Sequence, residues 1–353
     1  MQYASAIPKS QEDYLMSRNT EQKIKLLILY EIIQKNTDET NPMTTQELIS
    51  ALKERGIEVS RKTLYEDIQT LNEYGYDVLC DRSRANRYYI GSRRFERTEV
   101  QVLLNTIGAT HILTNKKTAV LMEKLSELIG VTEAERLQKV VAIGQKHGNE
   151  RIYYSIDAVT TAILEHKKLS FLYFDYDEHC KKVYRKEKTR YIVNPLGITA
   201  YGDNLYLICY HDKYGNTANY RLDRMDEAQV ESEEITYIKE YENFDVSTYR
   251  NEQFGMYYGE QKEIELIFPR DLIEVAIDRF GEDLKPVSIG NEEYIIKATI
   301  QISKIFFSWL TCFEGRVRIN SPESVREEYR DYLKNILEQE KSCYCSRVSQ
   351  IKK

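Results

Sequence analysis

Basic side chains gather in two strips of a chain that is acidic overall. Residues 82–94 hold five arginines and no acidic residue, and residues 181–191 hold six lysines and arginines against Glu187 alone. Guanidinium and ammonium groups donate hydrogen bonds to phosphate oxygens, and they attract a nucleic-acid backbone at longer range. Because the net charge is −6, the total conceals these strips. The sequence therefore predicts anion binding at two separate places.

The first strip follows a segment with the pattern of three short helices. Residues 20–36 carry apolar side chains at helical spacing, and two further helical patterns end at Gly56 and Gly75. The sequence then alternates between apolar and polar residues and turns near Ser83–Asn86, as a hairpin does. Three helices and a basic hairpin are the layout of a winged helix-turn-helix, which we predict over residues 20–95.

The third of these helices is expected to enter the major groove of DNA, while the hairpin reaches the neighbouring backbone or minor groove. Glu66 and Asp67 argue against this, because acidic side chains that face phosphate weaken binding. They are compatible with it if they face basic neighbours or solvent, and a structural role for Asp67 is an alternative. A module for protein contacts is the other interpretation. The predicted DNA-binding residues are Thr45, Ser60, Arg61, Lys62, Thr63, Tyr65, Gln69, Arg82, Arg84 and Arg87.

The rest of the chain predicts a helical block and two mixed pieces. Residues 98–147 have helical spacing and are expected to bridge two domains, to form a dimer interface or simply to pack. From about residue 152 a helix leads into closely spaced short strands, which indicate a bent antiparallel sheet or barrel. Residues 231–259 have the composition of a linker. The tail reads as strand, helix, strand, helix, short strand and helix, a small α+β domain.

Four ordered blocks stand out between residues 162 and 225: AILEHKKLSFLYFDY (162–176), RYIVNPLGI (190–198), NLYLICYHD (204–212) and YRLDRM (220–225). Together they resemble the WYL-domain family of bacterial transcriptional regulators. The family's tripeptide is present as Leu205-Tyr206-Leu207, with leucine in place of tryptophan. SRKTLYEDIQTLNEYG (60–75) resembles the family's recognition helix but departs from it at Tyr65-Glu66, where the family often has an arginine. WLTCFEGRVRINSPESVREEY (309–329) resembles the family's C-terminal extension, named WCX.

This resemblance implies an α+β multidomain chain. The implied parts are the winged helix-turn-helix, a helical linker (96–150), a small Sm-like β-barrel or WYL domain (151–232) and an α+β C-terminal extension (260–340). The WYL domain is implied to sense single-stranded DNA or another nucleotide-type ligand in a basic, aromatic-lined groove. The alternative is that the arginines pair with nearby acids and the tyrosines belong to the core. The implied ligand-binding residues are Tyr173, Tyr176, Arg190, Tyr206, His211, Tyr220, Arg221 and Arg224.

Other function classes find no support in the sequence. The 353 residues contain no phosphate-binding loop, dinucleotide fingerprint, nucleophile elbow or zinc-protease motif, so no enzyme activity and no cofactor are expected. The six cysteines lack metal-type spacing and are expected to be reduced thiols without a metal. No apolar run is long enough for a membrane span, and the N-terminus lacks a secretory signal, so a cytoplasmic, nucleoid-associated protein is expected.

The sequence thus predicts a regulator that binds operator DNA as a homodimer and responds to a nucleic-acid or nucleotide ligand. RNA polymerase is a further candidate partner, and no membrane partner is expected. Two alternatives stay open. One is a constitutive DNA-binding regulator whose later domains serve only dimerisation or polymerase contact. The other is a protein-interaction module with a degenerate head.

Overall fold

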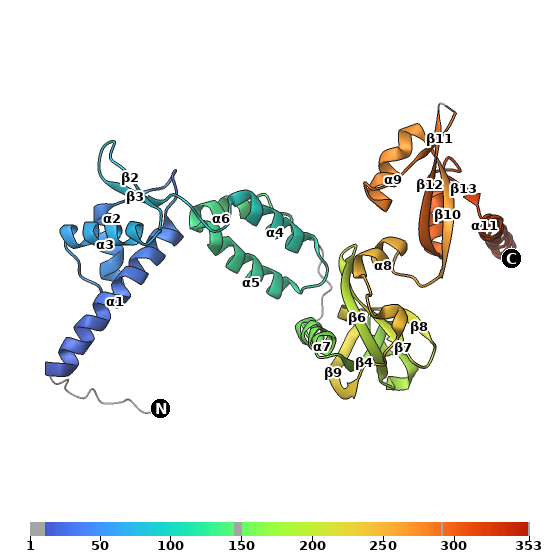
Figure 1. Ribbon diagram of the computed structural model, residues 1–353, viewed down its shortest axis with the longest axis horizontal. Helices are drawn as coiled ribbons and strands as arrows, with labels where there is room; N and C mark the ends of the chain where they lie inside the picture. Colours follow the sequence, from blue (N-terminus) through green and yellow to red (C-terminus); the bar gives the residue numbers. More distant parts are fainter. Residues whose placement is uncertain (1–10, 145–149, 291, 352–353) are drawn as a thin grey trace. The chain divides into compact units, whose positions relative to one another are not determined.

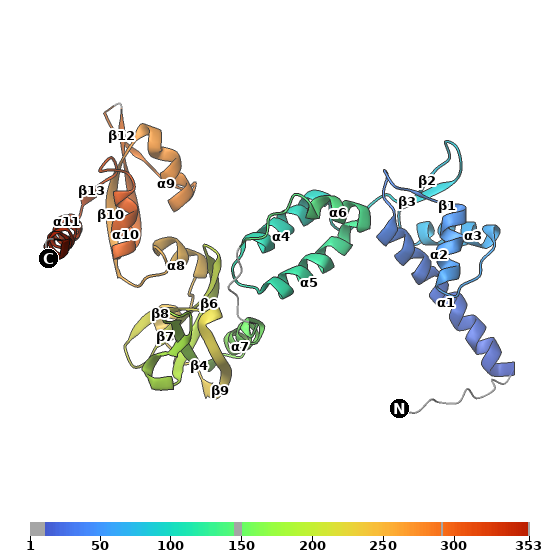
Figure 2. The ribbon, with the colours of Figure 1, turned by 180° about the vertical axis from the view of Figure 1, so that it is seen from behind.

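The computed structural model describes residues 11–144, 150–290 and 292–351, without the side chains of 11–23, 240 and 341–351. The chain divides into two compact units, Met1–His147 and Gly148–Lys353. Figures 1 and 2 show the elements of both units from opposite sides. In the described part of the chain, no helix combines the length and apolarity that a membrane crossing requires.

The first unit opens with three helices and a small antiparallel sheet whose strand order is β1-β3-β2. The Thr44 hydroxyl accepts from the Glu47 N–H while the Glu47 carboxylate accepts from the Thr44 N–H, which fixes the start of α2. At the start of α3 the Ser60 hydroxyl accepts from the Thr63 N–H, a one-way cap. The first helix begins earlier than the predicted residue 20. The elements are α1 (Gln11–Asn36), β1 (Met43–Thr44), α2 (Thr45–Glu54), α3 (Arg61–Glu73), β2 (Val78–Asp81) and β3 (Arg87–Ile90).

A helical block completes this unit. Gly130 separates two of its helices with a φ of 86°, a conformation that favours glycine. Val100, Leu104 and Leu137 are fully buried at its centre. Residues 145–149 of the predicted linker lie outside the described residues. The elements are α4 (Arg97–Ala109), α5 (Asn115–Ser126), η1 (Glu127–Ile129) and α6 (Val131–Gln138).

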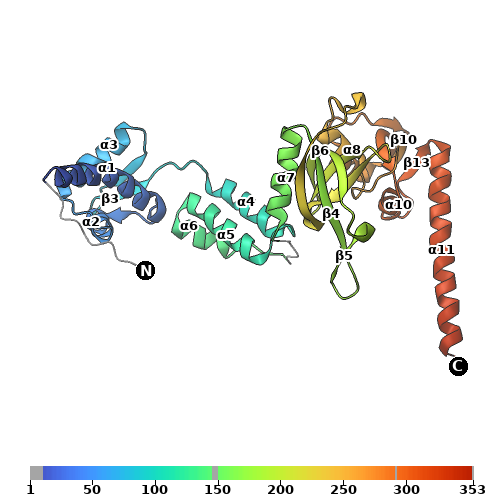
Figure 3. The same ribbon diagram turned by 90° about the horizontal axis from the view of Figure 1, so that it is seen from below.

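The second unit begins with a helix and a curled antiparallel sheet of order β5-β4-β6-β7-β8, in which β9 also pairs with β4. Figure 3 shows the strands β4, β5 and β6 of this sheet. Strand register shifts between Pro195 and Gly197 and at two places on β4, and such bulges bend a sheet. The bending stops short of closure, so the predicted barrel is a half-barrel. The elements are α7 (Ile152–Leu164), β4 (Lys167–Tyr176), β5 (Lys182–Tyr184), η2 (Arg185–Lys188), β6 (Tyr191–Tyr201), β7 (Asn204–His211), β8 (Asn216–Arg221), η3 (Leu222–Arg224) and β9 (Met225–Glu234).

Strand β9 follows β8 through the short turn η3 but pairs with β4, which leaves the half-barrel open between β8 and β9. The segment around α8 (Val246–Glu252) packs against β8 in its place. The Tyr249 hydroxyl lies 3.3 Å from the Thr217 hydroxyl, and the Asn219 amide donates to the Met256 carbonyl at 3.0 Å. The linker predicted over 231–259 is therefore partly helical and part of the packing.

The C-terminal part is a four-stranded antiparallel sheet of order β11-β12-β10-β13 with helices against it. Phe268 and Phe306 are fully buried in its core, and the rings of Phe254 and Phe306 lie 5.1 Å apart. The predicted alternation of strands and helices is present, with β11 as an additional strand. The elements are η4 (Lys239–Tyr241), β10 (Glu260–Pro269), η5 (Arg270–Leu272), α9 (Ile273–Phe280), β11 (Val287–Ile289), β12 (Glu293–Ile302), α10 (Lys304–Thr311), β13 (Arg318–Ser321) and α11 (Glu323–Ile351).

Candidate functional site

Helix α3 presents half of the side chains predicted to bind DNA. Arg61 and Lys62 are exposed in its first turn, and Tyr65 is 40% exposed one turn later. Gln69 is exposed as well, although its amide donates to the Glu73 carboxylate at 2.8 Å. Exposed donors along one helix suit contact with phosphates and base edges.

Two of the three acidic residues of α3, Glu66 and Asp67, have separate partners. Asp67 is buried and forms an ion pair of 2.8 Å with Lys25 on α1, so its role is structural, as the alternative interpretation held. Glu66 lies 3.9 Å from the Lys62 ammonium, one helical turn away on the exposed face. Glu66 and Glu73 therefore add negative charge beside the predicted DNA-binding residues of this helix, whereas the buried Asp67 does not.

Three other residues predicted to contact DNA, Thr45, Ser60 and Thr63, already form local hydrogen bonds. Thr45 is only 9% exposed, because it lies in the first turn of α2 beneath the hairpin, and its N–H donates to the Asn86 carbonyl. This leaves its side chain little surface to offer to a duplex. The hydroxyls of Ser60 and Thr63 lie 2.9 Å apart at the start of α3. These two can reach a phosphate only by exchanging a hydrogen bond that they already make.

The hairpin exposes Arg82, Arg84 and Arg87, as predicted. Arg93, from the same basic strip, instead donates to the Gln34 and Thr37 carbonyls at 2.6 Å each. A guanidinium at the C-terminal end of α1 satisfies carbonyls that lack helical partners. Within this strip, the arginines of the hairpin are thus exposed, whereas Arg93 caps the end of α1.

In the second unit, aromatic side chains from four neighbouring strands form a buried layer. The Tyr173 and Tyr220 ring centroids lie 5.0 Å apart, and the Phe171 ring stacks on that of Tyr191 at 5.5 Å. Tyr173 is 6% exposed and Tyr220 is 9% exposed. Their faces are therefore covered by one another, and the prediction that they stack on bases is not supported by their burial.

His211 belongs to the same layer. Its Nε2 atom lies 2.7 Å from the Tyr220 hydroxyl, and the imidazole is buried. Burial lowers the pKa of His211, and the nearby Lys186 lowers it further, while Asp212 opposes the shift. A neutral imidazole that forms a hydrogen bond with the Tyr220 hydroxyl stabilises the aromatic layer. This structural role differs from the predicted contact with phosphate.

Basic side chains lie over this layer. The Lys186 ammonium is 3.8 Å from the centre of the Tyr191 ring, and the Arg185 guanidinium is 5.1 Å from that of Tyr173. The backbone around them is unusual, because Lys186, Glu187 and Lys188 have φ values of 49°, 52° and 65°. The sequence predicted anion binding by the strip 181–191, but it did not predict that Arg185 and Lys186 lie over aromatic rings.

The predicted arginines of the turn after β8 are held by carboxylates. Arg224 Nη1 donates to Asp175 at 2.9 Å, and Arg185 donates to both oxygens of the same carboxylate at 2.6 and 3.1 Å. Arg221 forms a two-point pair with Asp223 at 3.0 and 2.8 Å. The hydrogen bond from Arg185, with the charge of Arg224, lowers the pKa of Asp175 below its usual range.

We call Arg185, Lys186, Arg221 and Arg224 the basic cluster. The Tyr173 hydroxyl ties its parts together, because it accepts from the Arg221 N–H at 3.2 Å. Burial raises the pKa of Tyr173, and the charges of Arg224 and Arg185 partly offset that effect. A guanidinium fork that holds a carboxylate has the geometry to hold a phosphate. The basic cluster can therefore bind an anion that displaces its internal carboxylates.

The other implied ligand contacts lie at the margin of the cluster. Arg190 donates to the Ser170 hydroxyl at 2.9 Å and to the Glu227 carbonyl at 2.6 Å, so it joins β4 to β9. Tyr206 is half-buried opposite Arg221 in the sheet, and burial raises its pKa. Tyr176 is 47% exposed and, unlike Tyr173, offers a face to solvent.

Metal-type groupings are absent from the described residues: no three histidine, cysteine, aspartate or glutamate side chains could hold an ion together. Cys80, Cys180, Cys209 and Cys312 are free thiols. Cys343 and Cys345, predicted to be reduced thiols too, belong to the part of α11 whose side chains lie outside the described residues.

Three comparisons place this architecture among known proteins. Residues 155–230 match the family model of the WYL domain. No curated protein matches the chain. A solved structure of proteasome accessory factor B/C (PafBC) of Arthrobacter aurescens is 20% identical with a TM-score of 0.27, over 90% of this chain and 49% of that one. A CRISPR Cas-related protein is 14% identical with a TM-score of 0.35, over 96% of this chain and 89% of the other.

This chain spans about half the length of the PafBC structure, and likenesses of this degree carry no functional assignment. The family-model match is different, because it covers a defined segment. That segment begins in α7, contains β4 to β8 and ends in β9, and it includes the whole basic cluster. The curled antiparallel sheet of the second unit is therefore the part of the chain that matches the WYL-domain model, and residues 155–230 are called the WYL domain below.

Proposed function

We propose that this protein is a DNA-binding transcriptional regulator controlled by a nucleic-acid or nucleotide-type ligand at its WYL domain. The observation that carries the proposal is the basic cluster, in which guanidinium forks lie over a buried aromatic layer and hold carboxylates that a phosphate can replace. The exposed Tyr176 adds a face on which a base can stack.

The proposed DNA-binding part is a winged helix-turn-helix over residues 20–95. Its support is the exposed polar face of α3 beside a hairpin with three exposed arginines, and the pairing of Asp67 with Lys25 removes one objection. We propose that two copies of the chain read the two halves of a pseudo-palindromic operator, since paired heads double the contact area. A cytoplasmic location, without catalysis or a cofactor, belongs to the same proposal.

Selection of fragmented genomic duplex by the purified chain, with and without short single-stranded oligonucleotides, tests both parts together. The expected result is enrichment of one palindromic site to a degree that the oligonucleotide changes. Enrichment that ignores the oligonucleotide contradicts the ligand part and favours a constitutive regulator whose later domains serve dimerisation or RNA-polymerase contact. No enrichment contradicts the DNA-binding part and favours a protein-interaction module.

Two variants assign the effects to residues. Arg221→Ala removes one fork of the basic cluster and is expected to abolish the response to the oligonucleotide while operator binding persists. Arg316→Ala is the matched control, because Arg316 pairs with Asp271 on the surface of the C-terminal part. A full response by the Arg221 variant would place the ligand elsewhere.

A further inference from the structure

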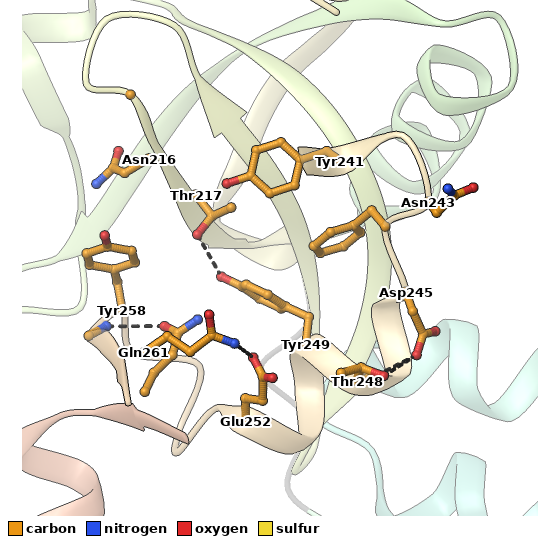
Figure 4. A pocket seen from close by; sticks show the side chains of 14 residues that line it. Asn216, Thr217, Tyr241, Asn243, Asp245, Thr248, Tyr249, Glu252, Tyr258 and Gln261 are labelled. Carbon is orange, nitrogen blue, oxygen red and sulfur yellow. Dashed lines mark hydrogen bonds between the residues drawn. The ribbon is translucent and has the colours of Figure 1, made fainter. Parts of the chain in front are cut away.

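A cavity of about 440 Å³ lies beside the start of β8. Its lining is acidic and aromatic, in contrast to the basic cluster. Figure 4 shows its lining residues, which come from the end of the WYL half-barrel, from α8 and from the C-terminal sheet. The volume is in the range of small-molecule sites. Among the residues that line it there is no lysine, arginine or histidine.

Two carboxylates line this cavity, and they differ in what they are free to do. Asp245 accepts from the Ser247 and Thr248 N–H groups and from the Thr248 hydroxyl, so it is occupied as the cap of α8. Glu252 accepts a hydrogen bond from the Gln261 amide at 2.8 Å, and burial raises its pKa. Glu252 is thus a half-buried acid without a cation among its lining neighbours.

The remaining lining suits the body of an organic ligand. Tyr241 and Tyr258 contribute rings to the lining, as Figure 4 shows, and the hydroxyl of the buried Tyr249 lies 3.3 Å from that of Thr217. Aromatic faces attract cations, and the attraction strengthens where water is partly excluded. A carboxylate, aromatic rings and amide groups together favour a positively charged guest and disfavour a phosphate.

We propose that this cavity binds a small organic cation, with an ammonium or guanidinium group on Glu252 and an apolar body between Tyr241 and Tyr258. The site takes a ligand of opposite charge to the one proposed for the basic cluster. It is therefore independent of the proposed function, and either proposal can fail without the other.

Binding of 2-phenylethylamine to the full chain, measured by calorimetry and by amide resonance shifts, tests this proposal. The expected result is saturable binding in the low millimolar range or tighter, with shifts at Thr217 and Gln261. Phenylacetate and N-acetyl-2-phenylethylamine keep the ring but replace the cation with an anion or a neutral group. Each is expected to bind about tenfold more weakly or worse, since a charge-assisted hydrogen bond is lost.

Glu252→Gln keeps the size of the side chain and an oxygen for the Gln261 amide, and it is expected to weaken amine binding by about tenfold. Glu263→Gln removes the same charge from an exposed position on β10 and is the matched control. Equal binding of amine and phenylacetate, unchanged amine affinity in the Glu252 variant, or no amine binding in the millimolar range overturns the proposal. The resonance shifts of the unaltered chain decide the matter should the variant fail to fold.

Discussion

Replacing Asp175 with asparagine is expected to raise the affinity of the WYL domain for a phosphate ligand. Asp175 is 38% exposed and pairs with Arg185 and Arg224, which are 49% and 30% exposed. Solvent and salt screen pairs of this exposure, so each contributes roughly 0.5–1 kcal/mol. A ligand that takes both arginines must displace about 1–2 kcal/mol of internal pairing, which corresponds to a factor of about 5 to 30 in affinity.

Fluorescence anisotropy with a labelled single-stranded oligonucleotide measures this gain. Asp157→Asn is the matched control, because it removes the same charge from an exposed position on α7 of the same domain. The sign of the change separates two roles for Asp175. A competitor of phosphate gives tighter binding when it is removed, whereas a residue that merely orients Arg185 and Arg224 gives weaker binding. Unchanged or weaker binding by Asp175→Asn would refute the competition described above.

Three further outcomes are expected. Arg61→Ala with Lys62→Ala should weaken duplex binding and flatten its salt dependence by about two phosphate contacts, and an unchanged titration would contradict the assignment of α3. Burial lowers the pKa of His211, so the folded protein holds it in the neutral form. Its contribution to the free energy of unfolding should therefore be complete above its ordinary pKa of about 6.5 and decrease as the pH drops below that value. The thermal unfolding of the His211→Gln variant should lack this pH dependence. Lys25→Met should cost roughly 2–4 kcal/mol in urea unfolding because Asp67 stays buried without its partner, and a loss below 1 kcal/mol would contradict that burial.

What could be predicted from the sequence is what depends on neighbours along the chain. The caps at Thr44 and Ser60 each involve a residue three positions away, and the helices after them were expected where they occur. The alternation of strands and helices in the C-terminal part has the same local origin. By contrast, α1 begins at Gln11, before the apolar pattern from which a start at residue 20 was predicted.

The sequence could not predict which residues far apart along the chain pair with one another. Arg224 meets Asp175 across 49 positions, and Arg93 meets the Gln34 carbonyl across 59. Nothing in a basic strip says which of its arginines caps a helix and which faces solvent. The burial of Tyr173 did leave a signal, because β4 is apolar at nearly every position from Leu169 to Phe174 and not at alternate ones. Such a run indicates a strand that is covered on both faces.

The internal carboxylates also bear on which anions the basic cluster can select. Asp175 and Asp223 together hold Arg185, Arg221 and Arg224, so a bound anion replaces existing charge pairs rather than filling a bare positive site. A single small anion gains about as much from one fork as it loses by displacing the carboxylate there. A ligand with several linked phosphates pays its entropic cost of association once and then engages several forks. The internal pairing therefore favours an oligonucleotide over free phosphate.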